Sequence, residues 1–268
     1  MLSRGRGFTL IEMVMVIVLL GITSVGIGSF IRLGSQAYAE VSARDELIAS
    51  ARFAVERLNR ELRQALPNSI RANFSSVNVQ CVEFMPIVAS TIYQDIPVAP
   101  EPASDTLSII NFSGANNVNN NHSVAVYPIN ETDLYASNTR YIYPVDSVNI
   151  AANADTGTVE LDVPTNVHFA EDSPTQRLYF ISQSIRYCVE NTELYRYEQV
   201  NNVLNRVLMA QNLQIPNNNP SDAIPDYAPF ELATPSQFRN AITRADLRFN
   251  RGGEQVIFNN EVQVLNVP

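Results

Sequence analysis

A run of nineteen uncharged residues, Met13–Ile31, limits most strongly what this chain can fold into. Between residues 8 and 31 the only charged side chain is that of Glu12. A helix needs roughly 20 apolar residues, at ~1.5 Å each, to cross the hydrocarbon core of a bilayer. The sequence therefore predicts a membrane-spanning helix at residues 8–31. The Glu12 carboxylate needs an explanation of its own, because a charge inside the membrane costs about 3 kcal/mol unless it is neutralised.

Two arginines, Arg4 and Arg6, lie directly before the apolar run. By the positive-inside rule they hold the N-terminus in the cytoplasm, so the long C-terminal part crosses the membrane. A cleaved secretory signal would have a shorter apolar region without a carboxylate, ending at small residues. A plain signal anchor would explain the length and the orientation, but it gives Glu12 no role.

The N-terminal residues resemble those of type IV prepilins and the related pseudopilins. The resemblance rests on an arginine-containing leader, the segment GFTLIE from Gly7 to Glu12, and the long apolar helix that follows. It implies that a prepilin peptidase cleaves between Gly7 and Phe8 on the cytoplasmic side, with Arg4 and Arg6 as the positive charges of the leader. It also implies N-methylation of the new Phe8 amine, so that the mature chain comprises residues 8–268.

The same resemblance implies a role for Glu12. Cleavage creates a positive amine on Phe8, and this amine lies at nearly the same membrane depth as the Glu12 carboxylate of a neighbouring subunit. Opposite charges attract strongly in a medium of low dielectric, so assembly neutralises the carboxylate. The alternatives are a protonated Glu12 or a Glu12 that simply lies in an interface.

Three glycines, Gly21, Gly26 and Gly28, lie in the second half of the predicted span. Glycine weakens a helix by ~1 kcal/mol relative to alanine in water, whereas small residues in a membrane allow helices to approach closely. These glycines therefore predict either local melting of the helix or tight packing of the helix against a neighbouring helix.

An amphipathic helix is predicted to continue beyond the membrane. Apolar residues recur at steps of three and four from Ile48 to Leu66, and most arginines of the segment fall between them. The pair Pro67-Asn68 ends the pattern. We therefore divide the helix into a membrane half, residues 8–31, and an extracytoplasmic half, residues 32–66. Its basic face is interpreted as solvated, with anionic lipid or an acidic partner as the alternative.

Residues 67–268 read as a β-rich periplasmic domain of short alternating runs bounded by turn residues. With the helix they predict an α+β fold of the type IV pilin kind, in which one antiparallel sheet covers the apolar stripe of the helix. Two segments rich in Pro, Asn and Asp, Pro86–Ser104 and Gln211–Ser236, are interpreted as surface excursions. The predicted strands are Val79–Phe84, Thr106–Phe112, Ser123–Tyr127, Thr158–Val163, Leu178–Ile181, a hairpin of Ile185–Val189 with Leu194–Tyr197, a hairpin of ADLRFN with EQVIFNN joined by Arg251, Gly252 and Gly253, and a separate final run EVQVLNV.

The chain has two cysteines, Cys81 and Cys188, and both fall in predicted strands. In an oxidising periplasm we expect the pair to form a disulfide bond, which closes a loop worth up to ~4 to 5 kcal/mol in the chain-entropy model. Two buried free thiols are the alternative.

Charge and motif content argue against several classes of function. Residues 32–71 carry a net charge of +2, with seven Arg against five acids, whereas residues 72–268 carry −12, with nine Arg against twenty-one acids. An acidic domain without a basic stripe is a poor match for nucleic acid.

His122 and His168 have no ligand cluster near them in sequence, so we expect no metal, no cofactor and no catalytic residue. Calcium at Glu171-Asp172, or at Asp222 with Asp226, is a weak alternative.

The resemblance narrows to the minor prepilins of the mannose-sensitive haemagglutinin (MSHA) pilus of the MshO type. It rests on FAVERLNRELRQALPNSIR, on the RYCVE and LYRYE strands, and on the ending LRFNRGGEQVIFNNEVQVLNVP. It implies an inner-membrane protein that primes pilus assembly or lies at the tip, with other pilins, the prepilin peptidase, the assembly machinery and the lipid bilayer as partners. The alternatives are a tip adhesin using the Asn- and Tyr-rich loops between residues 113 and 143, a type II secretion pseudopilin and, remotely, a membrane-anchored periplasmic enzyme.

Overall fold

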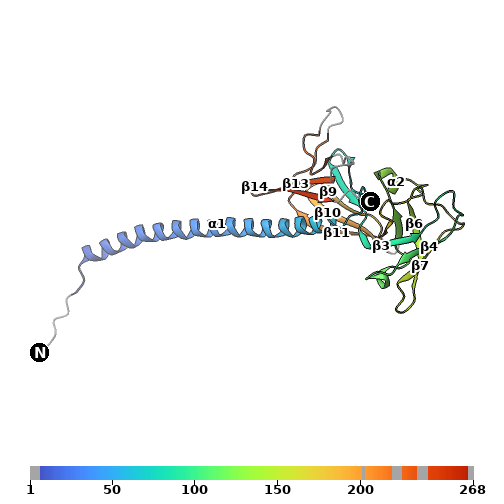
Figure 1. Cartoon of the computed structure of the whole chain (residues 1–268). Coiled ribbons are helices and arrows are strands. Elements are labelled where there is room, and N and C mark those ends of the chain that lie inside the picture. Colours follow the sequence, from blue (N-terminus) through green and yellow to red (C-terminus); the bar gives the residue numbers. More distant parts are fainter. Residues whose placement is uncertain (1–6, 201–202, 219–224, 234–240, 265–268) are drawn as a thin grey trace. The chain divides into compact units, whose positions relative to one another are not determined.

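The computed structural model describes residues 7–200, 203–218, 225–233 and 241–264 (Figure 1). The chain divides into two compact units, residues 1–49 and residues 50–268. One helix, α1 (Leu10–Leu62), runs through the boundary between them. The predicted α+β fold is confirmed, since a long N-terminal helix is combined with antiparallel sheets in a pilin-like arrangement.

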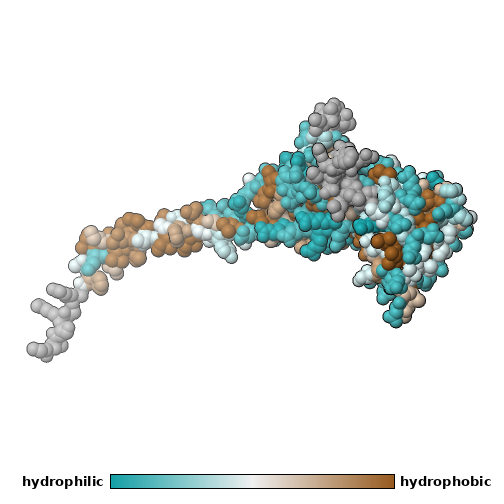
Figure 2. Space-filling view, viewed as in Figure 1, coloured by the Kyte–Doolittle hydropathy of each residue, from teal (hydrophilic) through white to brown (hydrophobic). Residues whose placement is uncertain are grey.

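The first unit contains the exposed N-terminal part of α1. Up to residue 31, apolar side chains lie on all sides of the helix, and Figure 2 shows this stretch as mostly brown. A helix that is apolar all round is typical of a segment covered by lipid or by other helices. In the described part of the chain, α1 is the one helix long and apolar enough to cross a membrane, with a mean hydropathy of 2.5 over 18 residues.

The glycines of the span do not interrupt α1. Three neighbouring hydroxyl groups donate to carbonyl oxygens of the preceding turn: Thr23 to Leu19 at 2.9 Å, Ser24 to Leu20 at 2.6 Å, and Ser29 to Gly26 at 2.9 Å. Their polar groups are therefore satisfied within the helix, as an apolar environment requires.

The helix ends at Leu62, whereas the sequence predicted an end at Leu66. The reason is competition from a strand, because the Leu66 N–H donates to the Met85 carbonyl and the Ile87 N–H to the Gln64 carbonyl, both at 2.8 Å. Sheet-type pairing thus replaces the last helical turn before Pro67 removes a backbone donor.

The last turns of α1 belong to the second unit and contribute to its core. The side chains of Ala51, Ala54, Val55, Leu58 and Leu62 are buried. They recur at helical spacing, so one stripe of the helix lies against the sheets.

The central element of the second unit is a five-stranded antiparallel sheet in the order β1-β2-β9-β10-β11. In the pairing of β2 with β9, Cys81 lies directly opposite Cys188, and the two form a disulfide bond that joins residues 107 positions apart. A loop of that length corresponds to about 4 to 5 kcal/mol in the chain-entropy model. The strands are β1 (Arg71–Ser76), β2 (Val79–Phe84), β9 (Ile185–Glu190), β10 (Glu193–Val200) and β11 (Val203–Gln211).

A closed six-stranded barrel is inserted between β2 and β9. Its strands follow the order β3-β4-β7-β6-β5-β8 around the barrel, and its interior is apolar, built on residues such as Leu107, Val124, Val159 and Phe180. At Gly157 a Cβ atom would lie 2.5 Å from a side-chain carbon of Ile150, so β6 and β7 can approach only with glycine there. The strands are β3 (Ile87–Asp95), β4 (Thr106–Ile110), β5 (Ser123–Val126), β6 (Ile142–Ile150), β7 (Thr156–Leu161) and β8 (Arg177–Ile181), with a short helix α2 (Glu131–Tyr135) and a 3-10 turn η1 (Ala115–Asn117) in the connections.

A three-stranded sheet completes the unit, with β12 (Phe230–Ala233), β13 (Ala241–Arg251) and β14 (Glu254–Val264) in that order. Gly252 and Gly253 both have positive φ and form the hairpin turn, whereas Arg251, which the sequence also placed in the turn, pairs with Glu254 in the ladder. One side chain fastens this sheet to the five-stranded sheet, because the buried amide of Gln80 donates to the Phe230 carbonyl and accepts from the Phe230 N–H, each at 2.8 Å.

Several predictions about the β-rich part were wrong. The structure has a barrel and two sheets instead of one sheet. The supposed excursion at Pro86–Ser104 contains β3, and the one at Gln211–Ser236 contains β12, with residues 219–224 and 234–236 outside the described residues. The final run is not a separate strand, because Asn259 and Asn260 pair with Asp246 and Ala245 and carry β14 through to Val264. Strands β1, β6 and β11 were not predicted at all.

A buried ion cluster joins α1 to the five-stranded sheet. The guanidinium of Arg196, whose side chain is only 7% exposed, donates to Glu61 of α1 at 2.9 Å and to Glu198 at 2.5 Å. Burial alone lowers the pKa of Arg196, but hydrogen bonds and attraction from the two carboxylates outweigh it and raise the pKa overall. Burial, followed by the charge of Glu61, also raises the pKa of the neighbouring Tyr187.

We expect Arg196→Met to lower the free energy of unfolding by about 3 kcal/mol, because it removes the buried cation from the mostly buried Glu61, which keeps only its more exposed partner Arg57. Urea denaturation of the full chain in detergent micelles, followed by circular dichroism, measures this. The matched control is Arg244→Met, which breaks a half-exposed pair with Glu261 and should cost less than about 1 kcal/mol. Equal losses in both variants would contradict the importance of the buried cluster.

Candidate processing and assembly site

The predicted cleavage site lies in extended chain before α1. Gly7, Phe8 and Thr9 precede the first helical residue, Leu10, and the Phe8 side chain is 82% exposed. A peptide bond outside a helix can enter a protease active site without unwinding. Arg4 and Arg6, the predicted leader charges, lie outside the described residues.

Glu12 occupies the first turn of α1 and turns back toward the start of the helix. The Thr9 N–H donates to its Oε2 atom at 3.5 Å, while the Glu12 N–H donates to the Thr9 carbonyl at 3.2 Å. Thr9 and Glu12 thus have the spacing of a capping box, in which a carboxylate at the third helical position binds the backbone of the capping residue. The sequence signal for this capping role is the T-x-x-E pattern of Thr9 and Glu12 within GFTLIE.

The first turn of a helix leaves backbone N–H groups without helical partners, and the Glu12 side chain lies beside them. The same geometry sets Glu12 four residues from Phe8, so a cleaved chain would carry a cation and an anion close together at one end of an apolar helix. Among the described residues, the Glu12 side chain is exposed and has a long, weak contact with the Thr9 N–H.

Residues 2–28 match the family model of the prokaryotic N-terminal methylation motif. The chain carries a prepilin-type methylation motif. This motif is typical of type IV prepilin-like proteins, and it implies processing by a prepilin peptidase and assembly with other pilins. Together with the apolar helix, it indicates anchoring in the inner membrane before assembly. Comparison with curated proteins and with solved structures gives no match.

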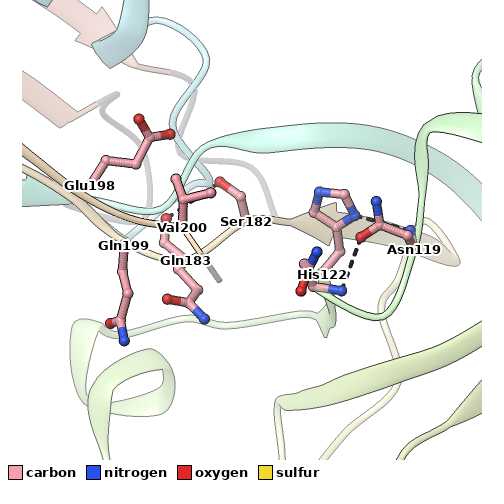
Figure 3. A pocket seen from close by; sticks show the side chains of 8 residues that line it. Asn119, His122, Ser182, Gln183, Glu198, Gln199 and Val200 are labelled. Atoms are coloured by element: carbon pink, nitrogen blue, oxygen red, sulfur yellow. Dashed lines mark hydrogen bonds between the residues drawn. The ribbon is translucent and has the colours of Figure 1, made fainter. Parts of the chain in front are cut away.

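A separate polar pocket of about 250 Å³ lies in the second unit (Figure 3). Three segments form it: the loop before β5, the link between β8 and β9, and the end of β10. Figure 3 shows Asn119 and His122 facing Glu198 and Val200 across the pocket, with Ser182 near its middle. The lining residues are Asn119, Asn121, His122, Ser182, Gln183, Glu198, Gln199 and Val200.

The chemistry of this pocket suits binding better than catalysis. The His122 Nδ1 atom accepts a hydrogen bond from the Asn119 N–H at 3.1 Å, and burial lowers the pKa of the ring. A neutral imidazole already used as an acceptor is a poor general base. Glu198 is held by Arg196, as described above, and the other polar groups are amides and a hydroxyl, which recognise ligands by hydrogen bonds.

Two carboxylates of the alternative calcium sites have structural partners. Asp172 accepts from the Tyr93 hydroxyl at 3.1 Å, and Asp226 accepts from the Asn217 amide at 2.7 Å. His168 lies 2.8 Å from the Glu101 carbonyl through its Nε2 atom. Within the described ranges no three His, Cys, Asp or Glu residues are grouped as metal ligands require. Asp222 lies outside the described residues.

Two tyrosines of the predicted adhesive loops are tied to the fold. The Tyr135 hydroxyl donates to the Ser69 carbonyl at 2.8 Å and its ring lies 3.7 Å from the Arg71 guanidinium carbon. The Tyr143 hydroxyl donates to the His168 carbonyl at 2.8 Å. Of the 113–143 region, the asparagines beside His122 are therefore better placed to meet a ligand than these rings.

Proposed function

We propose that the chain is a minor pilin that takes part in the assembly of a type IV pilus, priming the filament or lying at its tip. The observation that carries the proposal is the prepilin-type motif at the exposed start of an apolar helix, joined to a large β-rich unit. The motif and helix support membrane anchoring and lateral assembly, while the β-rich unit supports contacts specific to this subunit. We propose no catalytic role, in keeping with pilin-like proteins in general.

This proposal assigns a role to each segment of the chain. Residues 1–7 act as the leader peptide, residues 8–31 as the membrane and assembly segment, residues 32–66 as the extracytoplasmic segment, and residues 67–268 as the periplasmic domain. The peptidase cleaves between Gly7 and Phe8, the Phe8 amine is methylated, and Glu12 pairs with the amine of a neighbouring subunit.

The finer assignment to the MSHA pilus rests on the resemblance to its MshO-type minor prepilins. The β9–β10 hairpin and the β13–β14 hairpin contain the segments that carry this resemblance, and both form complete antiparallel ladders. A type II secretion pseudopilin is the alternative, because it would have the same N-terminal motif and a similar layout.

We expect the mature chain to begin at N-methylated Phe8. Intact-mass and N-terminal peptide analysis of the protein, purified from cells that contain the matching prepilin peptidase, measures this directly. The matched control is Gly7→Val, which should leave the leader attached because a bulky residue replaces the glycine next to the cleaved bond. A wild-type chain that keeps Met1 in such cells would contradict the proposal and leave a plain signal anchor.

We expect Glu12→Ala to leave membrane insertion intact and to lower incorporation into pili by about tenfold or more, as loss of a charge pair worth over about 1.4 kcal/mol predicts. Immunoblots of membranes and of sheared pili measure the two quantities. Glu12→Gln separates the two roles of the side chain, because glutamine also serves in a capping box but carries no charge. If Glu12→Gln restored incorporation, helix capping and not charge pairing would be the function of Glu12.

The polar pocket favours a second candidate function, a binding module carried by the pilus. Its lining contains Asn119, Asn121 and His122 from the loop region that the sequence pointed to. On this hypothesis the subunit both joins the filament and contacts a surface ligand.

We expect the double substitution Asn121→Ala and Gln183→Ala to reduce attachment of cells to surfaces several-fold while pilus number stays unchanged, because it removes two amides without touching the core. Adhesion counts and electron microscopy of the same cultures measure both. Asn149→Ala, on the exposed side of β6, is the control. Parallel loss of pili and attachment would show that the pocket is structural.

A further inference from the structure

The outer edge of β11 is open. This strand ends the five-stranded sheet, and among the residues that the structure places, no strand pairs with its far side. Every second residue of an edge strand turns its N–H and C=O away from the sheet, so a row of unpaired backbone groups faces outward. Beyond Leu208 the edge is covered, since Met209 and Ala210 are buried and Leu213 pairs with Phe249 of β13. The open stretch is therefore residues 203–208.

The side chains of this stretch are unusually apolar for an exposed edge. Val203 is 61% exposed, Leu204 56%, Val207 46% and Leu208 45%. Proteins usually place lysine, proline or inward-pointing charges on open edge strands, which prevents pairing with another chain. The sequence VLNRVL has one charge, Arg206. That guanidinium already binds Glu190 at 2.9 Å and stacks 3.5 Å over the Tyr195 ring. An exposed, extended, apolar edge without guards is typical of a site for strand addition.

We propose that β11 pairs in antiparallel fashion with β11 of a second copy of this chain. The argument for this occupant is that the strand complements itself in one register. In an antiparallel ladder, hydrogen-bonded and non-hydrogen-bonded pairs alternate. A two-fold axis between two neighbouring residue pairs would exchange a hydrogen-bonded pair with a non-hydrogen-bonded pair, which is impossible. The axis therefore passes through the centre of one pair, and the residue of that pair lies opposite its own copy.

The register centred on Asn205 fits best. It sets Asn205 against Asn205, Val203 against Val207, and Leu204 against the aliphatic stem of Arg206. The register centred on Arg206 opposes two like charges, which destabilises a strand pair. The register centred on Leu204 sets Asn205 against Val203, and those centred beyond Arg206 run into the covered part of the edge. Apolar contacts, an amide pair and the absence of opposed charges all select Asn205.

Cysteine cross-linking in membranes tests this register. Both native cysteines are in the Cys81–Cys188 disulfide, so Asn205→Cys gives the chain one free thiol. Directly opposed residues have Cα atoms about 4.5 to 5.5 Å apart, within the range that a disulfide can bridge. We expect full-length Asn205→Cys, mildly oxidised in membranes, to give about tenfold more homodimer than Asn149→Cys on the exposed side of β6. Peptide mapping confirms that residue 205 is joined to residue 205.

Two further variants keep the test decisive. Val203→Cys and Val207→Cys should each cross-link poorly alone and well when two differently tagged chains are co-expressed, because this register makes them partners. Adding Leu204→Lys to Asn205→Cys should abolish the cross-link, since it places a cation opposite Arg206, while the exposed position leaves the fold intact. Dimer yields no higher than those of Asn149→Cys, or cross-links from residue 205 only to another protein, would overturn the proposal.

Discussion

The contact between Glu61 and Arg196 decides how the two kinds of secondary structure in this protein are joined. The helix supplies a carboxylate and the sheet supplies a guanidinium, and both are largely removed from water, so the loss of either leaves a charge with one partner fewer in the interior. Around this ion pair the apolar stripe from Ala51 to Leu62 is excluded from solvent, and the five-stranded sheet gains its cover. A force applied along α1 is therefore resisted in the second unit by a specific ion pair as well as by non-directional apolar contacts.

The membrane end shows how far the candidate site could be read from sequence. GFTLIE, the arginine-containing leader and the length of the apolar run are local signals, so the motif and the start of the helix were predictable from neighbouring residues. The turn of Glu12 toward the Thr9 N–H is also local, yet it was missed, because the charge-pairing interpretation concealed the simpler capping pattern. The polar pocket could not be predicted, since the loop at Asn119–His122 is far in sequence from Ser182–Gln183 and Glu198–Val200 and meets them only through the topology of the barrel and the sheet.

The fold shows the same division between local and distant information. Hairpins with clear alternation or a glycine pair, such as β9–β10 and β13–β14, were predicted near their observed positions. Strand β3 was missed because IVASTIYQD mixes polar and apolar residues without alternation, and its burial comes from closing the barrel against β8. Strand β11 was missed for the opposite reason, since the apolar residues of its 203–208 stretch are exposed and no alternation of buried and exposed positions gives that stretch a pattern. The switch of Ala65 and Leu66 from helix to strand pairing depends on Met85 and Ile87, which no helical propensity could anticipate.

The disulfide bond has a consequence that concerns the covalent path of the chain. All six barrel strands, from Ile87 to Ile181, lie between Cys81 and Cys188, so the barrel is a loop whose two ends are tied at its base. A protease that nicks any connection of the barrel leaves both fragments attached, and the helix stays linked to the C-terminal sheet. Insertions, deletions or exchange of the whole barrel leave the tie and the β2–β9 ladder in place. The barrel is thus the part of the molecule that can diverge most freely without severing α1 from the C-terminal sheet.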